Sequence, residues 1–316
     1  MIIFGAGLAG LLAGNMLRSL NPKVWEAQSN LPNNHEALLR FRTDRVGTSC
    51  AIPFKKVDVS KAIKYDNKLL TSPDLFLSNL YSQKVTGAVW PRSINNLSPV
   101  SRYIAPLDLI NQMAGGCNIK CDKPLSWEFL EEHKAFEKEE PIISTIPMPA
   151  LMKMVGWDEF PEFKSQKIWT QRATIDSPES GVYQTIYYPD KIVGHYRASV
   201  IGQTVIVESI RKPNLDSGQA IMEILRDDFG IEAKRLTNIY SGVQNYGKIM
   251  PIDESIRKKF IFEMTTRYNL YSVGRFATWR QLLLDDVVED IQKVEQFIRG
   301  DSDYNRKMKS QKGADQ

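Results

Sequence analysis

The sequence predicts an α/β protein in which a parallel sheet with helices on both faces is interrupted by a mainly antiparallel sheet. Short apolar strands beside helices occur near both ends of the chain and near its middle, at residues 1–4, 141–147 and 269–274. Residues 167–210 instead alternate apolar and polar side chains in runs separated by turns, as antiparallel strands do. The expected units are a discontinuous parallel domain in 1–50, 100–155 and 240–300, a second domain in 51–99 and 156–239, and a flexible tail in 301–316.

The first strand runs directly into a glycine-rich turn, Gly5-Ala-Gly7-Leu8-Ala9-Gly10. Gly5 permits a tight turn, Gly7 lets the backbone approach a diphosphate, and Gly10 allows the next helix to pack closely on the strand. Leu8 and Ala9 open that helix, which is expected over residues 8–20 and whose first N–H groups favour an anion. The turn therefore predicts a site for a dinucleotide.

A second strand ends at Glu26, about 20 residues after the first glycine. A carboxylate there accepts hydrogen bonds from ribose hydroxyls and disfavours a 2′-phosphate, so NADP is not expected. The motif alone does not choose between NAD and FAD. An NAD dehydrogenase usually completes its nucleotide domain in one continuous run, whereas the interrupted domain of this chain favours FAD.

The composition further limits the classes of protein to which the chain can belong. The chain has 316 residues, of which 42% are hydrophobic and 25% charged, with a net charge of +4. No stretch approaches the roughly 20 apolar residues of a membrane span, and a strand beginning at residue 2 leaves no room for a secretory leader. With three cysteines and three histidines, neither a disulfide framework nor a metal site is expected. We expect a cytoplasmic protein.

A second glycine junction lies between the last strand and the last helix. Gly274-Arg275 is followed by Thr278, Trp279 and Arg280. With this segment the chain resembles the flavoprotein superfamily that contains amine oxidases and UDP-galactopyranose mutase. The mutase carries Gly-Arg-x-x-Thr-aromatic-Arg and then an acid before its last helix, a position that Asp285 or Asp286 would take here.

This resemblance implies a Rossmann-like FAD-binding domain with an inserted substrate domain, and FAD as the cofactor. In that family the segment lies over the flavin and its ribityl-phosphate arm, which assigns Gly274, Arg275, Thr278 and Trp279 to cofactor binding. Residues 143–147 resemble the strand and proline that follow the flavin-domain hairpin, which adds Thr145 and Pro147. These assignments rest on the resemblance and not on spacing.

The chain departs from the family after the second strand, where the usual Gly-Gly-Arg is absent. Residues 35–42 stand in its place. Arg40 and Arg42 are candidate substitutes that would contact the cofactor. The alternative is that both are surface arginines on an edge strand.

Two absent motifs limit the types of reaction that the chain could catalyse. The chain lacks the cysteine pair that disulfide reduction would require. It also lacks a second glycine motif, and so a separate domain for NAD(P)H. Two classes remain: oxidation of a C–N bond in an amine or amino-acid group, and a non-redox reaction of the mutase type. A lysine near flavin N5 is a feature of amine oxidases, and Lys248 could take that role.

Tyr196 and Arg197 are further catalytic candidates on the predicted antiparallel sheet. An inward Arg197 requires an anionic partner. In the mutase alternative, Arg197 and Arg280 would bind a nucleoside diphosphate. A third alternative is a nucleotide-binding scaffold without catalysis.

A further resemblance concerns the substrate. Residues 37–42, 102–106 and 272–277 resemble compact flavoproteins encoded by tailed bacteriophages, some of which act in thymidine hypermodification. It implies an FAD lyase that oxidises an amino acid attached to thymine, such as glycinyl-thymidine, and leaves an aminomethyl base. The expected partners are a small-molecule or modified-base substrate and DNA, with no membrane and no metal. If the protein is viral, its expected location is the host cytoplasm.

Overall fold

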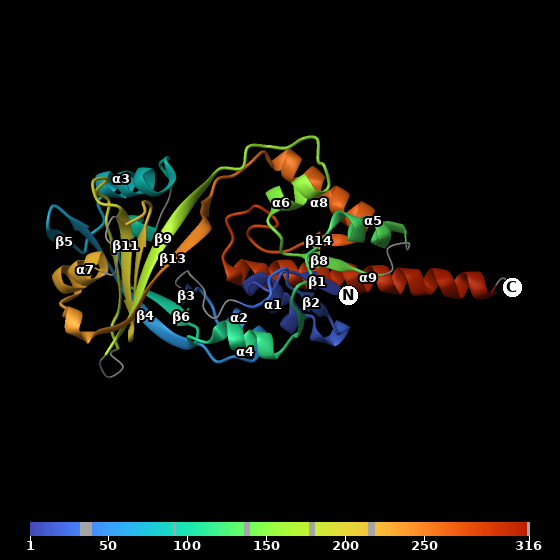
Figure 1. Cartoon of the computed structure of the whole chain (residues 1–316), viewed down its shortest axis with the longest axis horizontal. Helices are drawn as coiled ribbons and strands as arrows, with labels where there is room; N and C mark the ends of the chain where they lie inside the picture. The colour runs from blue at the N-terminus through green and yellow to red at the C-terminus, as the bar shows by residue number, and fades with distance from the viewer. Residues whose placement is uncertain (32–39, 91–92, 136–139, 177–180, 214–218, 315–316) are drawn as a thin grey trace.

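The computed structural model describes residues 1–31, 40–90, 93–135, 140–176, 181–213 and 219–314. Two sheets lie side by side, and the long strands β9 and β13 lead from one towards the other (Figure 1). The predicted fold class is confirmed: one sheet is parallel and carries helices on both faces, and the other is mainly antiparallel.

The parallel sheet has the strand order β14-β8-β1-β2-β7. Its strands are β1 (Ile2–Phe4), β2 (Lys23–Trp25), β7 (Asn118–Lys120), β8 (Ile142–Ser144) and β14 (Leu270–Ser272). One face packs on α1 (Leu8–Met16), α2 (Arg45–Cys50), α4 (Leu109–Gly115) and α9 (Leu284–Ala314). The opposite face packs on α5 (Trp127–Ala135), α6 (Met148–Met154) and α8 (Glu254–Tyr268).

The larger sheet has the order β13-β9-β12-β11-β10-β4-β6-β3, with β5 paired to β4. Only the β4–β10 pair is parallel among its described pairs. Its strands are β3 (Arg40–Phe41), β4 (Lys55–Tyr65), β5 (Lys68–Leu70), β6 (Val100–Ile104), β9 (Ser165–Ile175), β10 (Tyr183–Tyr187), β11 (His195–Ile201), β12 (Thr204–Ser209) and β13 (Leu236–Ile249).

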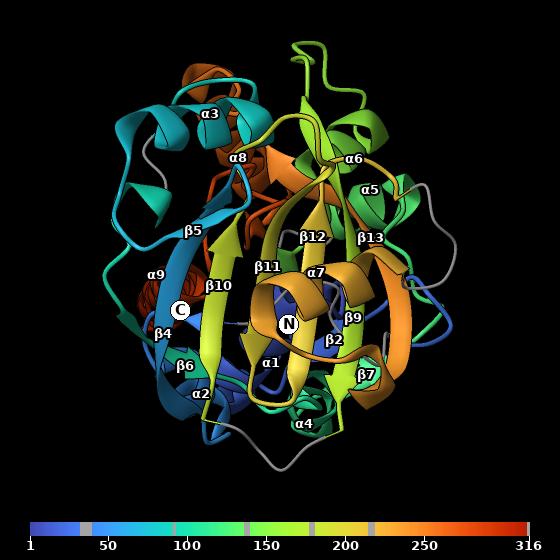
Figure 2. The ribbon, with the colours of Figure 1, turned by 90° about the vertical axis from the view of Figure 1, so that its left-hand side faces the viewer.

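Alternation in the larger sheet decides which side chains can reach a site. Ala198 and Val200 pack under α7 (Gln219–Phe229), which covers the outer face of the sheet (Figure 2). Ser199 lies between them in sequence, so it points to the opposite face, where its hydroxyl meets that of Thr185 at 2.9 Å. That face is turned towards the parallel sheet (Figure 1), except where α3 (Leu75–Thr86) covers one end.

Three boundaries differ from those expected. The helix expected over 8–20 ends at Met16, and a short 3-10 turn follows. Residues 100–104 and 240–249, which we assigned to the parallel domain, pair in the larger sheet because β6 adds to β4 and β13 adds to β9. The segment 301–314, expected as a flexible tail, continues α9.

Candidate functional site

The loops expected to hold a dinucleotide meet at one edge of the parallel sheet. They follow β1, β2, β8 and β14, whose carboxyl ends share that edge. Backbone hydrogen bonds join them: Gly5 N donates to Trp25 O at 2.8 Å, Thr145 N to Phe4 O at 2.9 Å, and Val273 N to Ser144 O at 2.9 Å. These four loops, which are distant in sequence, therefore form one continuous edge, the dinucleotide rim.

The three glycines of the first turn differ in what surrounds them. Gly5 has φ +96°, and a Cβ there would lie 2.3 Å from Thr145 Oγ1. A Cβ at Gly10 would lie 1.8 Å from the Gly5 carbonyl oxygen. A Cβ at Gly7 would meet no described atom within 4 Å. Packing therefore requires glycine at the first and third positions, whereas Gly7 borders open space.

That open space lies at the N-terminus of α1. Gly7 is the N-cap residue, no side chain caps it, and the first described bond of the helix runs from Leu11 N to Gly7 O at 2.9 Å. The N–H groups of the first turn, which include those of Leu8 and Ala9, have no acceptor within an α-helix. The arrangement is the one an anionic diphosphate requires, so the residues present suit a dinucleotide.

Glu26 borders the same rim. Its Oε2 accepts a hydrogen bond from Ala6 N at 2.7 Å, and its Oε1 accepts one from Gln28 N at 3.0 Å. These bonds hold the carboxylate beside the glycine turn, at the strand end where a ribose would lie.

The second glycine junction reaches the same place. Gly274 has φ +96°, and a Cβ there would lie 2.8 Å from the Cβ of Ala9. The segment after β14 thus lies directly against the start of α1. Arg275 is anchored nearby, with Nη2 donating to the Gly247 carbonyl at 3.5 Å.

Four other residues assigned to cofactor binding hold the loops in place. The Thr145 hydroxyl donates to Phe4 O at 2.9 Å, and the Thr278 hydroxyl donates to Gly274 O at 2.7 Å. Trp279 is buried with φ +47°, and its indole N–H donates to Met250 O at 2.9 Å. Pro147 is the N-cap of α6. The Thr145 and Thr278 hydroxyls and the Trp279 indole therefore all donate to backbone carbonyls of the protein.

Arg40 and Arg42 point in different directions. Arg40 Nη1 donates to Thr185 Oγ1 at 2.6 Å, so this guanidinium reaches the polar face of the larger sheet. Burial and then the positive charge of Arg197 lower the pKa of Arg40 to about 10. The Arg42 side chain pairs with Asp286 near the surface. Residues 35–39 of the same predicted loop lie outside the described residues.

Asp285 is the buried member of the two acids that follow the second junction. Its carboxylate accepts hydrogen bonds from Arg42 N at 3.2 Å, Thr43 N at 2.9 Å and the Thr43 hydroxyl at 2.8 Å. It therefore joins the start of α9 to the turn after β3.

The larger sheet brings three of the four predicted catalytic residues together. The Tyr196 hydroxyl donates to Glu208 Oε1 at 3.0 Å, and Arg197 binds the same carboxylate through Nε and through Nη2, the latter at 2.7 Å. Lys248 Nζ lies 5.6 Å from the centre of the Tyr196 ring. The cluster lies at the end of the sheet near α3, where Tyr81 packs against Tyr196.

The charges of this cluster depend on one another. Burial raises the pKa of Tyr196 well above its usual value, and the negative charge of Glu208 adds to the effect. Burial would raise the pKa of Glu208 as well, but the charge and hydrogen bonds of Arg197 outweigh burial and hold it below its usual value. The stable state is therefore a protonated tyrosine beside a charged Arg–Glu pair.

Glu208 is a member of this cluster that was not predicted from the sequence. Arg197 was expected to need an anionic partner, and Glu208 supplies it from the neighbouring strand, directly opposite in register. The signal was present as a single acid in the otherwise apolar or neutral strand Thr204–Ser209.

Arg280, the fourth predicted catalytic residue, has different surroundings. Its guanidinium pairs with Asp290 on α9 and lines a cavity between α8 and α9. The structure thus groups Lys248, Tyr196 and Arg197 and directs Arg280 elsewhere.

The face of the larger sheet that is turned towards the parallel sheet carries more cations than anions. Lys61 and Arg172 lie on it with Arg197, and Arg40 reaches it from β3. Burial lowers the pKa of Lys61, and the nearby positive charges of Arg102 and Arg40 act in the same direction. Glu208 is the one carboxylate that the strand register places on this face among the described residues.

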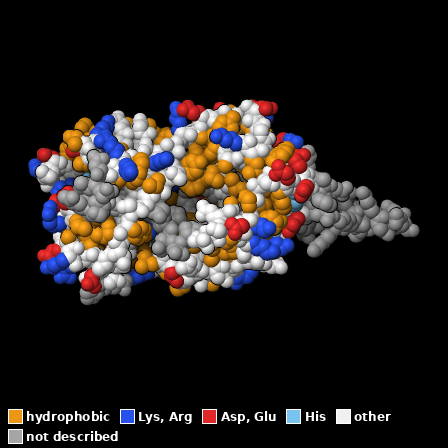
Figure 3. Space-filling model, viewed as in Figure 1, with side chains coloured by type: hydrophobic (Ala, Val, Ile, Leu, Met, Phe, Trp, Pro, Cys, Tyr) orange, Lys and Arg blue, Asp and Glu red, His pale blue; other side chains and the backbone are white. Residues whose placement is uncertain are grey.

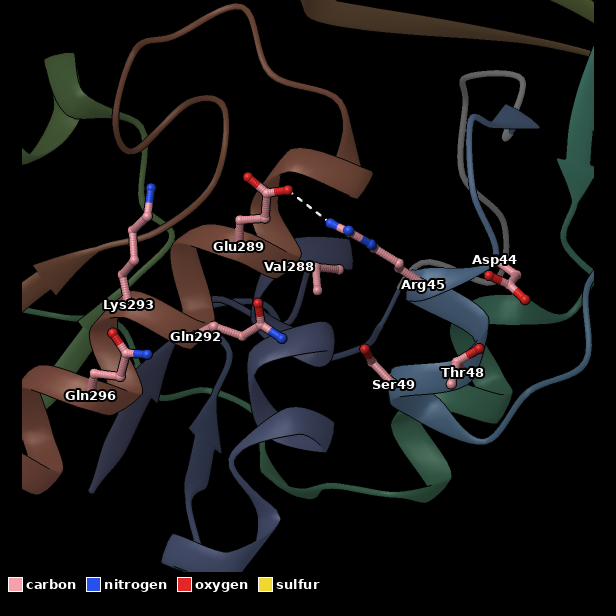
Figure 4. A pocket seen from close by; sticks show the side chains of 9 residues that line it. All are labelled: Asp44, Arg45, Thr48, Ser49, Val288, Glu289, Gln292, Lys293 and Gln296. Carbon is pink, nitrogen blue, oxygen red and sulfur yellow. Dashed lines mark hydrogen bonds and ion pairs between the residues drawn. The ribbon is translucent and has the colours of Figure 1, made fainter.

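Two described cavities lie on the outside of the parallel domain. One of about 680 Å³ separates α2 from α9, and the Arg45–Glu289 ion pair spans it (Figure 4). The other, of about 390 Å³, separates α8 from α9. Apolar side chains gather on the surface over α6 and α8 in Figure 3.

The described residues include no group of three or more His, Cys, Asp or Glu side chains placed to bind a metal ion. None of the described helices combines the length and the apolar character needed to cross a membrane.

No protein-family model and no curated protein sequence matches the chain. Solved structures do share its fold. Reduced UDP-galactopyranose mutase superposes with a TM-score of 0.61 at 14% identity, covering 94% of this chain and 93% of the mutase. A protein from Pyrococcus furiosus gives 0.54 at 12% identity, covering 93% and 96%. A Photorhabdus luminescens protein assigned as an FAD-containing monooxygenase gives 0.50 at 12% identity, covering 98% and 93%.

Proposed function

We propose that the chain is an FAD-dependent oxidoreductase that oxidises a C–N bond of an amine or amino-acid group. The main support for FAD binding is the open space at Gly7, which is bordered by the uncapped start of α1 and by Gly274. Glu26 would bind the adenosine ribose, and Arg275, Arg40 and Arg42 are the side chains proposed to contact the rest of the cofactor. The fold likeness to the Photorhabdus luminescens protein assigned as an FAD-containing monooxygenase supports this choice.

Bound FAD would supply an acceptor for a hydride, and this chain's residues would prepare the substrate. Hydride leaves an amine only when its nitrogen is neutral. A buried site rich in cations disfavours the ammonium form of a substrate, because like charges repel and burial penalises charge. Lys248 and Arg40 would provide that environment, while Glu208 remains paired with Arg197 and hydrogen-bonded to Tyr196.

We propose Lys248 and Tyr196 as the residues that orient the substrate. Lys248 Nζ lies beside the Tyr196 ring, so an amine held between the two would meet a hydrogen-bonding group and an aromatic face. Arg197 keeps Glu208 charged and thereby fixes the Tyr196 hydroxyl. Arg197 thus acts through other residues, as a positioning residue.

Our preferred substrate is an amino-acid-modified thymine in phage DNA, such as glycinyl-thymidine. Loss of a hydride and a proton would turn the C–N bond into an imine, and water would then release glyoxylate and leave an aminomethyl base. The excess of cations on the inner face of the larger sheet favours a substrate with anionic groups. The resemblance of residues 37–42, 102–106 and 272–277 to phage flavoproteins also supports the proposal.

A mutase-like, non-redox reaction on a nucleotide sugar is the second candidate. Its support is the fold likeness to UDP-galactopyranose mutase over nearly the whole of both chains. The Gly274-Arg275 and Thr278-Trp279-Arg280 motif points the same way. A non-catalytic nucleotide-binding scaffold is the third candidate.

The test is an anaerobic visible spectrum before and after adding DNA that carries glycinyl-thymidine, with unmodified DNA as the control. We expect oxidised-flavin absorption at about 450 nm that only the modified DNA bleaches. Lys248→Met should retain the flavin band and bleach far more slowly. A yellow protein that modified DNA does not bleach refutes this substrate and leads to UDP-galactose as the next addition. A colourless protein refutes FAD binding.

A further inference from the structure

The cavity between α8 and α9 is separate from the dinucleotide rim. It opens beside β14, the edge strand of the parallel sheet, and is lined by both helices and by the segment after Gly274. None of Gly5, Gly7, Gly10, Glu26 or Gly274 lines it. Its volume of about 390 Å³ is within the range of small-molecule sites.

Cations dominate its wall. Arg257, Lys258, Arg280 and Lys293 line it, against the single carboxylate of Asp290. Asp290 pairs with Arg280, and Glu254, which lies outside the lining, binds both Arg257 and Lys258. Two positive charges therefore remain in excess, and Lys293 forms no ion pair with any residue that the structure describes.

Ser272 lines the cavity, and its buried hydroxyl has no hydrogen-bond partner among the described residues. A buried hydroxyl without a partner costs about 1–3 kcal/mol, so such groups are normally satisfied by a ligand or water. Thr278, beside it, already donates to Gly274 O and accepts from Arg280 Nε at 3.3 Å.

One side of the cavity is apolar. Ile261, Phe262 and Val294 line it, and 68% of the Phe262 surface is exposed. An exposed phenylalanine beside a cationic wall suits a ligand that has an anionic head and an apolar body.

The neighbouring α2–α9 cavity lacks this asymmetry. Arg45 and Lys293 are balanced there by Asp44 and Glu289, and Arg45 is already paired with Glu289. In Figure 4 the Lys293 side chain extends away from Arg45, and it also lines the α8–α9 cavity. The positive charge of Lys293 is therefore available to the second cavity.

We propose that the α8–α9 cavity binds a small anionic molecule, with a phosphate or carboxylate head at Ser272, Arg280 and Lys293. Its apolar body would lie along Ile261, Phe262 and Val294. None of Lys248, Tyr196, Arg197 and Arg40, the residues proposed to act on the amine, lines this site. Thr278 and Arg280 do line it, so the experiment has to distinguish this cavity from the cofactor site.

Titration calorimetry of the purified full-length protein with phenyl phosphate tests the proposal, with phenol and inorganic phosphate as matched probes. We expect saturable binding of phenyl phosphate that is tighter than that of either probe. Ser272→Ala, which removes one buried oxygen, should weaken it about tenfold, as for the loss of one hydrogen bond to a charged group. Lys293→Gln, at an exposed position, should also weaken it.

Gly7→Val distinguishes this cavity from the dinucleotide rim, which could also attract a phosphate. Binding that persists in Gly7→Val and falls in Ser272→Ala supports the proposal. Binding lost in Gly7→Val, binding unchanged in both Ser272→Ala and Lys293→Gln, equal binding of phenol, or no saturable binding would each overturn it.

Discussion

Replacing Gly7 with valine should separate cofactor binding from folding. The Cβ of residue 7 would enter space that no described atom occupies within 4 Å, and φ −70° with ψ 178° is a conformation that valine adopts readily. Exchanging glycine for a non-capping residue at a helix N-cap costs about 1 kcal/mol or less. The cofactor-free protein should therefore unfold with almost unchanged stability.

The cofactor should be affected far more strongly. The valine side chain would occupy the place where the diphosphate approaches the first turn of α1. Losing two hydrogen bonds from backbone N–H groups to a charged phosphate costs roughly 3–6 kcal/mol, since each contributes about 1.5–3 kcal/mol. FAD should then bind about 100-fold to 10,000-fold more weakly, and the purified variant should be colourless.

The assay compares flavin per protein in the purified samples, FAD titration of cofactor-free protein, and urea unfolding without cofactor. Gly115→Val is the matched control, because its Cβ also enters open space but on an exposed turn of α4. Gly10→Val is the opposite control, since its Cβ would lie 1.8 Å from Gly5 O and should destabilise the fold itself. A yellow Gly7→Val protein with one flavin per chain would refute the assignment.

Three further predictions follow from side-chain contacts. Lys248→Met should keep its flavin yet slow anaerobic flavin reduction by about 100-fold; an unchanged rate would exclude Lys248. Glu208→Gln should lower the free energy of unfolding by about 3 kcal/mol, because Arg197 would keep a largely buried charge without its partner; unchanged urea unfolding would contradict this. Burial lowers the pKa of Lys84 to about 7, although its Nζ donates to three backbone carbonyls. An unfolded lysine titrates at about 10.4, so from pH 7 upward the unfolded chain holds a proton that the folded chain has lost, and stability should rise with pH by up to about 1.4 kcal/mol per unit. Lys84→Met should abolish this rise in denaturant unfolding at pH 7 and 9, and parallel pH curves would refute it.

The dinucleotide rim could be anticipated from the sequence because the patterns that predict it are local. A strand, a glycine turn and a helix place Gly7 at a helix N-terminus wherever they occur, and parallel strands bring Glu26 and Gly274 to the same edge. The antiparallel runs between 167 and 210 were recognisable for a similar reason, since alternation with period two marks a half-buried strand.

The cluster of Tyr196, Arg197 and Glu208 was only half predictable, because it depends on the register of the strands. Arg197 and Glu208 face each other through a pairing of β11 with β12 that contains an irregularity, and no local pattern fixes that pairing. The strand β13 was missed because most of its residues are exposed or half-buried and it contains Gly242 and Gly247, so alternation is weak. Arg280 lies apart from Lys248, Tyr196 and Arg197, which the motif could not show, because it fixes the position of Arg280 in the chain but not the direction of its side chain.

The two candidate reactions would use the positive charges of Lys248 and Arg40 differently. Their rates should therefore depend differently on pH. Around an amine substrate, the positive charges of Lys248 and Arg40 should lower the pKa of the bound ammonium below that of the free amine. The rate of flavin reduction should then rise with pH and level off at a pH below the pKa of the free amine. A nucleotide sugar has no such group, and its binding would depend on those cations through salt concentration instead. Amine oxidation is supported if the rate of flavin reduction rises with pH and if, in Lys248→Met, it levels off at a higher pH, closer to the pKa of the free amine. Turnover of UDP-galactose without net flavin reduction, flat over the same pH range and weakened by salt, would assign the site to the mutase class.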